Sequence, residues 1–133
     1  MVFLFSVFPL AEEISYIPDH LYNYRCERKD SLMGMAAINF EKKLEWHIII
    51  VEKIFTKWLE QGRLNQYKDE LAKWAIDFIY GDLKTNKIDE LTKGCVAGKL
   101  LDQLYRYDIK FSSIKEWYYK DAMRELKKMA LNK

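Results

Sequence analysis

One stretch of the sequence, NFEKKLEWHIIIVEKIFTKWLEQGR over residues 39–63, constrains the fold more than any other. Its apolar residues recur at intervals of three and four, the spacing that places side chains on one face of an α-helix. Asn39 can cap the start of this helix, and Gly62 stands where a left-handed residue commonly ends one. The sequence therefore predicts a helix near 39–60. Its apolar stripe consists of Phe40, Leu44, Ile48, Val51, Phe55, Trp58 and Leu59.

The same spacing resumes after Gly62 and Arg63 and predicts a second helix that ends at Gly81 and Asp82. A short turn between two amphipathic helices makes them antiparallel neighbours. The apolar stripe of this second helix consists of Leu64, Tyr67, Leu71, Trp74, Ala75 and Phe78.

Two further helices are expected after the polar connector DLKTNK. The first covers Ile88 to about Tyr107, and because Leu100 and Leu104 fall outside its main stripe, we expect neighbours on more than one face. The last helix is expected to begin at a cap formed by Ser112 or Ser113. The main stripe of the first consists of Ile88, Leu91, Cys95, Leu101 and Tyr105. The stripe of the last consists of Ile114, Tyr118, Ala122, Leu126 and Met129.

The N-terminal third gives weaker signals. Pro9 and Pro18 are each followed by acidic residues, a pattern typical of helix starts, which predicts a short helix over about 9–16 and another from about 18. We expect a break between Lys29 and Ala36. The opening MVFLFSVFPLAEE lacks the basic residues of a secretory signal, and its apolar run is far shorter than the ~20 residues that cross a bilayer. We therefore expect residues 1–8 to dock on the core; an interface with another chain and a targeting role are the alternatives.

The composition supports one helical domain. The 133 residues suit a single domain, and only 5 Gly and 2 Pro are too few for the many turns of a β-sandwich. We predict an all-α, irregular helical bundle of about five to seven helices spanning residues 1–133, with residues 1–8 as its docked apolar segment. The expected core contains Leu44, Phe55, Trp58, Leu71, Trp74, Phe78, Leu91 and Leu101.

His20 and His47 stand in no catalytic or metal-binding sequence pattern. Neither follows a Glu at the spacing used in di-metal bundles, and Cys26 and Cys95 match no zinc or redox spacing. We expect no catalytic residue, metal or cofactor, and two reduced thiols in a cytoplasmic protein. A hydrolase site assembled from distant residues is the remaining enzymatic alternative.

Surplus apolar and basic residues point to binding instead. Trp46, Ile49 and Ile50 lie off the main stripe of the 39–60 helix, beside Lys53, and the last helix carries Trp117. The prediction is a non-enzymatic protein-binding module, either an inhibitor or immunity-type protein or a small subunit of a complex, with no membrane partner. Burial of these side chains within the chain itself is the structural alternative. The predicted partner-binding residues are Trp46, Ile49, Ile50, Lys53, Trp117, Lys120, Arg124 and Lys127.

Nucleic acid is the second class of partner considered. Lys120, Arg124 and Lys127 repeat at four and three on the last helix, where an ordinary solvated face is the simpler interpretation because Asp121 and Glu125 interleave. The net charge of +2 is too small for a dedicated nucleic-acid binder. The basic residues available for this alternative are Lys120, Arg124 and Lys127, together with Arg25, Arg28 and Lys29.

Overall fold

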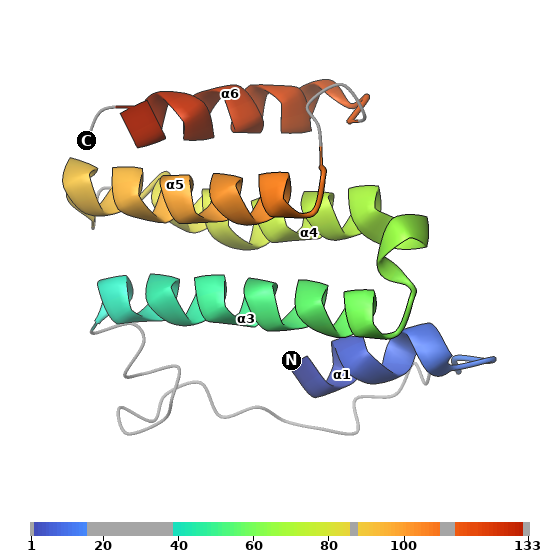
Figure 1. Ribbon diagram of the computed structural model, residues 1–133. Helices are drawn as coiled ribbons and strands as arrows, with labels where there is room; N and C mark the ends of the chain where they lie inside the picture. The colour runs from blue at the N-terminus through green and yellow to red at the C-terminus, as the bar shows by residue number, and fades with distance from the viewer. Residues whose placement is uncertain (1, 16–38, 86–87, 110–113, 132–133) are drawn as a thin grey trace.

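The computed structural model describes residues 2–15, 39–85, 88–109 and 114–131, and every regular element in these ranges is a helix (Figure 1). The all-α bundle predicted from the sequence is confirmed. The elements are α1 (Val2–Val7), the 3-10 helix η1 (Phe8–Leu10), α3 (Phe40–Glu60), α4 (Leu64–Leu83), α5 (Glu90–Arg106) and α6 (Trp117–Leu131).

The helices are stacked in layers. Figure 1 shows α4 and α5 in the middle, α6 on one side of them, and α3 on the other, with α1 packed against α3. Helices α4, α5 and α6 each run antiparallel to the long helix before them (Figure 1). Helices α4 and α5 each contact all three of the other long helices, so both are central, whereas the backbones of α3 and α6 do not come together in the part of the chain described.

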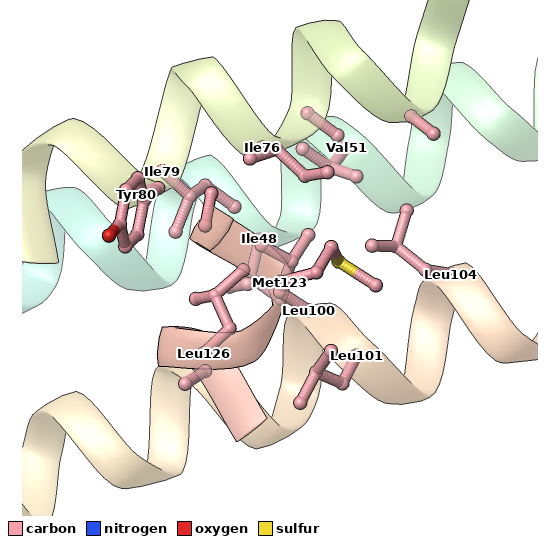
Figure 2. Close-up of a cluster of buried hydrophobic side chains, with 14 of the residues drawn as sticks. Ile48, Val51, Ile76, Ile79, Tyr80, Leu100, Leu101, Leu104, Met123 and Leu126 are labelled. Carbon is pink, nitrogen blue, oxygen red and sulfur yellow. The ribbon is translucent and has the colours of Figure 1, made fainter. Parts of the chain in front are cut away.

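Apolar side chains from all four long helices meet in one core (Figure 2). Leu44, Phe55, Leu71 and Leu101 are buried there as predicted, while Trp58, Trp74 and Phe78 are only partly buried and pack against its edge. The side chains labelled in Figure 2 are Ile48, Val51, Ile76, Ile79, Tyr80, Leu100, Leu101, Leu104, Met123 and Leu126.

Helix α3 has the termini that its sequence predicts. The Asn39 side-chain oxygen accepts a hydrogen bond from the backbone N–H of Lys42 at 3.0 Å. Gly62 has a φ of +67°, a left-handed conformation that other residues adopt at a cost. Its amide donates to the carbonyl of Leu59 at 2.9 Å, so the chain leaves α3 and enters α4 almost at once.

Helix α4 passes through Gly81 instead of ending there, so the predicted end was wrong. It continues to Leu83, which is fully buried, and Asp82 forms an ion pair with Lys43 of α3 at 2.8 Å. Glycine inside a helix costs only about 1 kcal/mol relative to alanine. These two tertiary contacts outweigh that cost.

The prediction for the inner side of α5 was wrong in part. Leu91 is 68% exposed and not in the core, and Tyr105 is exposed too, whereas Leu100 and Leu104 are fully buried. The inner side is lined partly by small residues, including buried Gly94. The prediction relied on large apolar side chains, and it therefore placed the buried stripe of α5 on the wrong part of the helix surface. The buried residues of α5 are Gly94, Val96, Ala97, Leu100, Leu101, Gln103 and Leu104.

Helix α6 begins at Trp117, and residues 114–116 before it are not helical, so it begins later than predicted; Ser112 and Ser113 lie outside the described residues. Ile114 is buried but precedes the helix, and Glu116 forms an ion pair with Lys73 of α4. These contacts hold residues 114–116 against the bundle before the first turn of α6. Farther along, the Tyr119 hydroxyl donates to Asp77 at 2.8 Å, and this hydrogen bond raises the pKa of Tyr119 to about 12.

The helix predicted over 9–16 is also wrong where the structure describes it. Within residues 8–15, only the single 3-10 turn η1 is helical. Ala11 is extended, and residues 10–15 are exposed. A short helix that buries no apolar face is not stable in water, whatever its starting residues. The predicted helix from 18 and the break at 29–36 lie outside the described residues.

Candidate partner-binding surfaces

Helix α1 is held on the bundle by aromatic and backbone contacts. The Phe5 ring lies 4.6 Å from that of Trp74, which stacks on Phe78 at 5.1 Å. The Trp58 indole N–H donates to the Phe5 carbonyl at 2.6 Å, and the Gln61 side chain donates to the Ser6 carbonyl at 3.1 Å. Residues of α1 thus dock on both α3 and α4.

A groove of about 460 Å³ lies between α1 and α3. Ile49, which is 46% exposed, supplies its largest apolar side chain, and Lys53 and Lys57 supply positive charge. Lys57 is partly neutralised by Glu60 at 3.4 Å. The residues lining the groove are Ser6, Ile49, Glu52, Lys53, Thr56, Lys57 and Glu60.

The predicted α3 residues differ in how much surface they present. Trp46 is 36% exposed, with the Lys42 ammonium 5.6 Å from its ring centre. Ile50 is half-buried and packs against the core. Trp46, Ile49 and Lys53 are therefore the accessible members of this cluster, and Ile50 is not.

Exposed apolar side chains also occur on α1 and η1, the segment for which an interface with another chain was the alternative to docking on the core. Single exposed apolar residues are ordinary, but several on two adjoining elements are typical of an interaction surface. We refer to α1, η1 and the outer side of α3 as the α1–α3 face. Its exposed large apolar residues are Leu4, Val7, Phe8, Leu10, Trp46 and Ile49.

The second predicted cluster lies on α6, across the bundle from α3. Trp117 is 75% exposed, and Lys120, Arg124 and Lys127 are all exposed. Arg124 pairs with Asp121 at 3.1 Å, and the Lys127 ammonium lies 5.8 Å from the Tyr105 ring centre. The eight predicted residues therefore form two separate surfaces. Arg25, Arg28 and Lys29 lie outside the described residues.

His47 occupies a partly buried position between α3 and α4. Its ring stacks on Phe78 at 4.0 Å, and its Nδ1 is 3.3 Å from an Asp82 oxygen, yet the geometry forms no hydrogen bond. Asp82 is instead hydrogen-bonded to Lys43 at 2.9 Å. Burial lowers the pKa of His47, and Lys43 lowers it further, against the opposing effect of Asp82. His47 is thus a packing residue.

This environment predicts a pH-dependent stability. The pKa of His47 is below its ordinary value of 6.5 in the folded chain, so on acidification the unfolded chain takes up the proton first. The free energy of unfolding should therefore fall as the pH drops below about 6.5 and level off below the folded pKa. His47→Gln should lose this component. Urea unfolding at intervals from about pH 7 to 5 measures it, and equal slopes for both proteins would contradict it.

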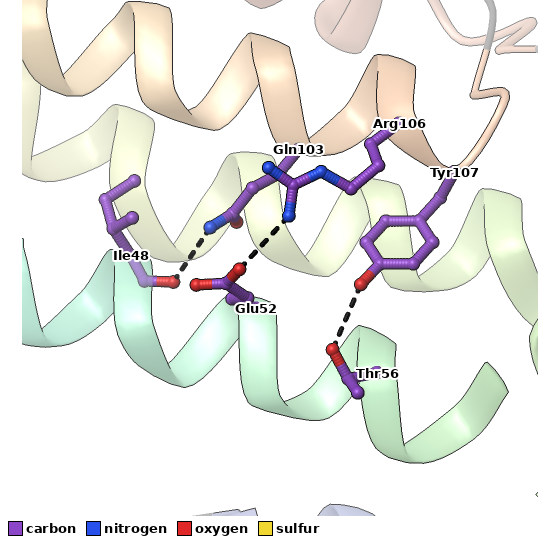
Figure 3. A network of polar contacts seen from close by, with 6 residues as sticks. All are labelled: Ile48, Glu52, Thr56, Gln103, Arg106 and Tyr107. Carbon is purple, nitrogen blue, oxygen red and sulfur yellow. Dashed lines mark hydrogen bonds and ion pairs between the residues drawn. The ribbon is translucent and has the colours of Figure 1, made fainter. Parts of the chain in front are cut away.

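Gln103 and its neighbours form a polar contact between α5 and α3 that the sequence interpretation missed (Figure 3). Gln103 is only 6% exposed, and its amide N–H donates to the Ile48 carbonyl at 3.3 Å. Its buried oxygen has no hydrogen-bond partner in the described structure, a deficit that typically costs about 1–3 kcal/mol. In the sequence, the position of Gln103 between Leu101 and Leu104 was the signal that could have indicated a buried polar side chain. Arg106 pairs nearby with Glu52 at 3.1 Å.

Two negative findings complete the description of these surfaces. Within the described ranges, no group of three or more His, Cys, Asp or Glu side chains is placed to hold a metal ion, and Cys95 is a half-buried free thiol. None of the described helices is both long and apolar enough to cross a bilayer. No protein-family model, curated protein or solved structure matches the chain, so its function is argued from these surfaces alone.

Proposed function

We propose that the chain is a non-enzymatic protein-binding module whose partner docks on the α1–α3 face. The observation that carries the proposal is the groove beside exposed Ile49, bordered by a helix that has exposed apolar side chains of its own. An inhibitor or immunity-type protein and a small subunit of a larger complex would both use such a face. Its cytoplasmic location remains a prediction from cysteine usage.

The docking mechanism follows from the charge and shape of this face. Binding energy at protein interfaces is concentrated in a few central apolar or aromatic anchors surrounded by a polar rim. Ile49 would be the central anchor, and Lys53 and Lys57 would meet acidic groups of the partner at the rim. Because Ile49 lies on a 21-residue helix packed on the core, its backbone is already ordered and little ordering entropy opposes docking.

Ile49→Asp tests this mechanism. A charge placed at the centre of an apolar contact should cost about 2 kcal/mol or more, which weakens partner binding by roughly 30-fold. Leu91→Asp is the matched control, since it makes the same change at an exposed apolar site on α5. The partner is recovered from the native host with the wild-type chain and its affinity for each variant is measured. Equal affinity for the two variants would contradict the proposal.

A nucleic-acid partner on α6 is the second candidate. The observation that favours it is the highly exposed Trp117, which precedes exposed Lys120 and Arg124 by one and two turns of the helix. The interleaved Asp121–Arg124 and Glu125–Lys128 pairs weaken the field of this face. Salt distinguishes the candidates, because phosphate-driven binding weakens steeply as salt rises whereas apolar docking changes much less.

A further inference from the structure

The outward side of α3 carries a stripe of residues with the spacing of a coiled-coil seam. They follow one another at intervals of four, three, four, three and four, so they form one line along the helix. All of them are exposed beside α1, so no helix in the described part of the chain covers this line. The residues of the stripe are Lys42, Trp46, Ile49, Lys53, Thr56 and Glu60.

The order of these intervals is the same when it is read from either end of the stripe. Two copies of α3 that pack antiparallel about a two-fold axis, at the level of Val51, therefore bring the stripe into register with itself. Lys42 lies nine residues before this level and Glu60 nine residues after it, so each lysine meets a glutamate of the other copy. Ile49 is two residues from the axis, which places the two copies of Ile49 about 6 Å apart along the helix.

The two halves of the stripe also differ in shape. Trp46, in the first half, presents an exposed indole, whereas residues of the second half line the groove between α1 and α3. In the antiparallel arrangement, Trp46 stands opposite Thr56 of the second copy, which is one of the lining residues. The groove volume of about 460 Å³ is sufficient for an indole. Each copy would therefore contribute one aromatic anchor and receive one.

Charge distinguishes this arrangement from a parallel one. Two parallel copies of α3 would set Lys42 against Lys42 and Glu60 against Glu60, and each groove would face another groove. Like charges across an interface oppose binding, whereas opposite charges fix its register. Glu60 can accept a second cation, because its side chain is exposed and its contact with Lys57 is 3.4 Å long. Lys53 can cover Ile49 of the second copy with its aliphatic stem while its ammonium stays in water.

We propose that a second copy of this chain covers the α1–α3 face and forms an antiparallel two-fold dimer through α3. The inference rests on the proposed function because it uses the same face, and it names the chain itself as the occupant in the absence of another partner. Lys42 and Glu60 pair at the two ends of the seam, Trp46 enters the groove, and the two copies of Ile49 meet beside the axis. Another protein that docks through Ile49 has to separate the two copies first.

Sedimentation velocity of the purified full chain between about 1 and 200 μM tests the dimer. The wild-type chain should be dimeric at the upper concentration. Lys42→Glu places two like-charge pairs in the dimer, and Glu60→Lys does the same with the opposite sign, so each variant alone should dimerise at least about tenfold more weakly. An equimolar mixture of the two variants restores opposite charges at both ends, and its affinity should return to within about threefold of the wild type.

Lys120→Glu is the matched control, because it makes the same charge change on the exposed side of α6, and it should dimerise like the wild type. Trp46→Ala empties the groove and should weaken the dimer at least about tenfold. Circular dichroism checks that each variant is folded. A wild-type chain that is monomeric at every concentration would overturn the inference, and so would a mixture that dimerises as weakly as its two components.

The proposed function fails or succeeds separately from the dimer. A monomeric wild-type chain leaves the docking of another protein intact, because the affinity of Ile49→Asp for that protein measures docking directly. Recovery of the dimer in the mixture of Lys42→Glu and Glu60→Lys supports the inference even where no other partner is recovered from the host.

Discussion

Leu100→Ala is expected to lower the free energy of unfolding by about 2–5 kcal/mol, a large fraction of the stability of a domain of this size. Leu100 is fully buried on α5, one of the two central helices, and its truncation removes apolar contact and leaves a cavity among α3, α4 and α6. Urea unfolding followed by circular dichroism measures the change from the transition midpoint.

The matched control is Leu91→Ala, the same substitution on the same helix. Leu91 is exposed, so its truncation should change the free energy of unfolding by no more than about 0.5 kcal/mol. Similar losses in both variants, or a larger loss at Leu91, would contradict the orientation of α5 described above.

Ala97→Asp is expected to have a still larger effect, at least about 3 kcal/mol, and to leave the protein largely unfolded if its total stability is at the low end for domains. Ala97 is fully buried on α5, where a carboxylate would lose its hydration among the apolar side chains of the core. Thermal unfolding of the variant measures the loss.

The corresponding control is Leu91→Asp, which adds the same carboxylate in the exposed first turn of α5. An acidic residue is favourable near a helix N-terminus, so this variant should remain as stable as wild type to within about 0.5 kcal/mol. A folded, wild-type-like Ala97→Asp protein would show that α5 does not occupy the centre of the bundle.

The sequence predicted helices well where their apolar period and end signals agreed. Asn39, the stripe through Leu44 and Phe55, and Gly62 all point to one helix, and α3 has these termini and buries this stripe as far as Phe55, whereas Leu59 at its end is exposed. Helix α5 shows the limit of the method. Its inner side includes Gly94 and Ala97, and small residues give little hydrophobic signal although they allow helices to approach closely.

Tertiary contacts decided the helix ends that were predicted incorrectly. Gly81 indicates a helix end in the sequence, but the burial of Leu83 and the ion pair of Asp82 stabilise α4 beyond this residue. Pro9 indicates a helix start in the sequence, yet no side chain of residues 10–15 is buried to stabilise a helix there. The helix propensity of one residue contributes from a fraction of a kcal/mol to about 1 kcal/mol. The free energy gained by burying a single leucine can therefore outweigh it.

The candidate surfaces were predictable only in part. The position of Ile49 off the main stripe of α3 indicated an outward side chain, because helical spacing fixes direction around a single helix. The contribution of α1 to the same face, and the separation of the α3 and α6 clusters, depend on how helices pack and are not encoded in any one helix. The unpaired oxygen of Gln103 likewise depends on contact with α3.

Site-specific photo-crosslinking tests the central claim, docking of a partner on the α1–α3 face, most directly. A photoreactive amino acid is placed at position 49 in one protein and at position 91 in another, and each is irradiated in an extract of the native host. The account predicts a discrete protein adduct from position 49 and none from position 91. Adducts that form equally from both positions, or only from position 91, would contradict it.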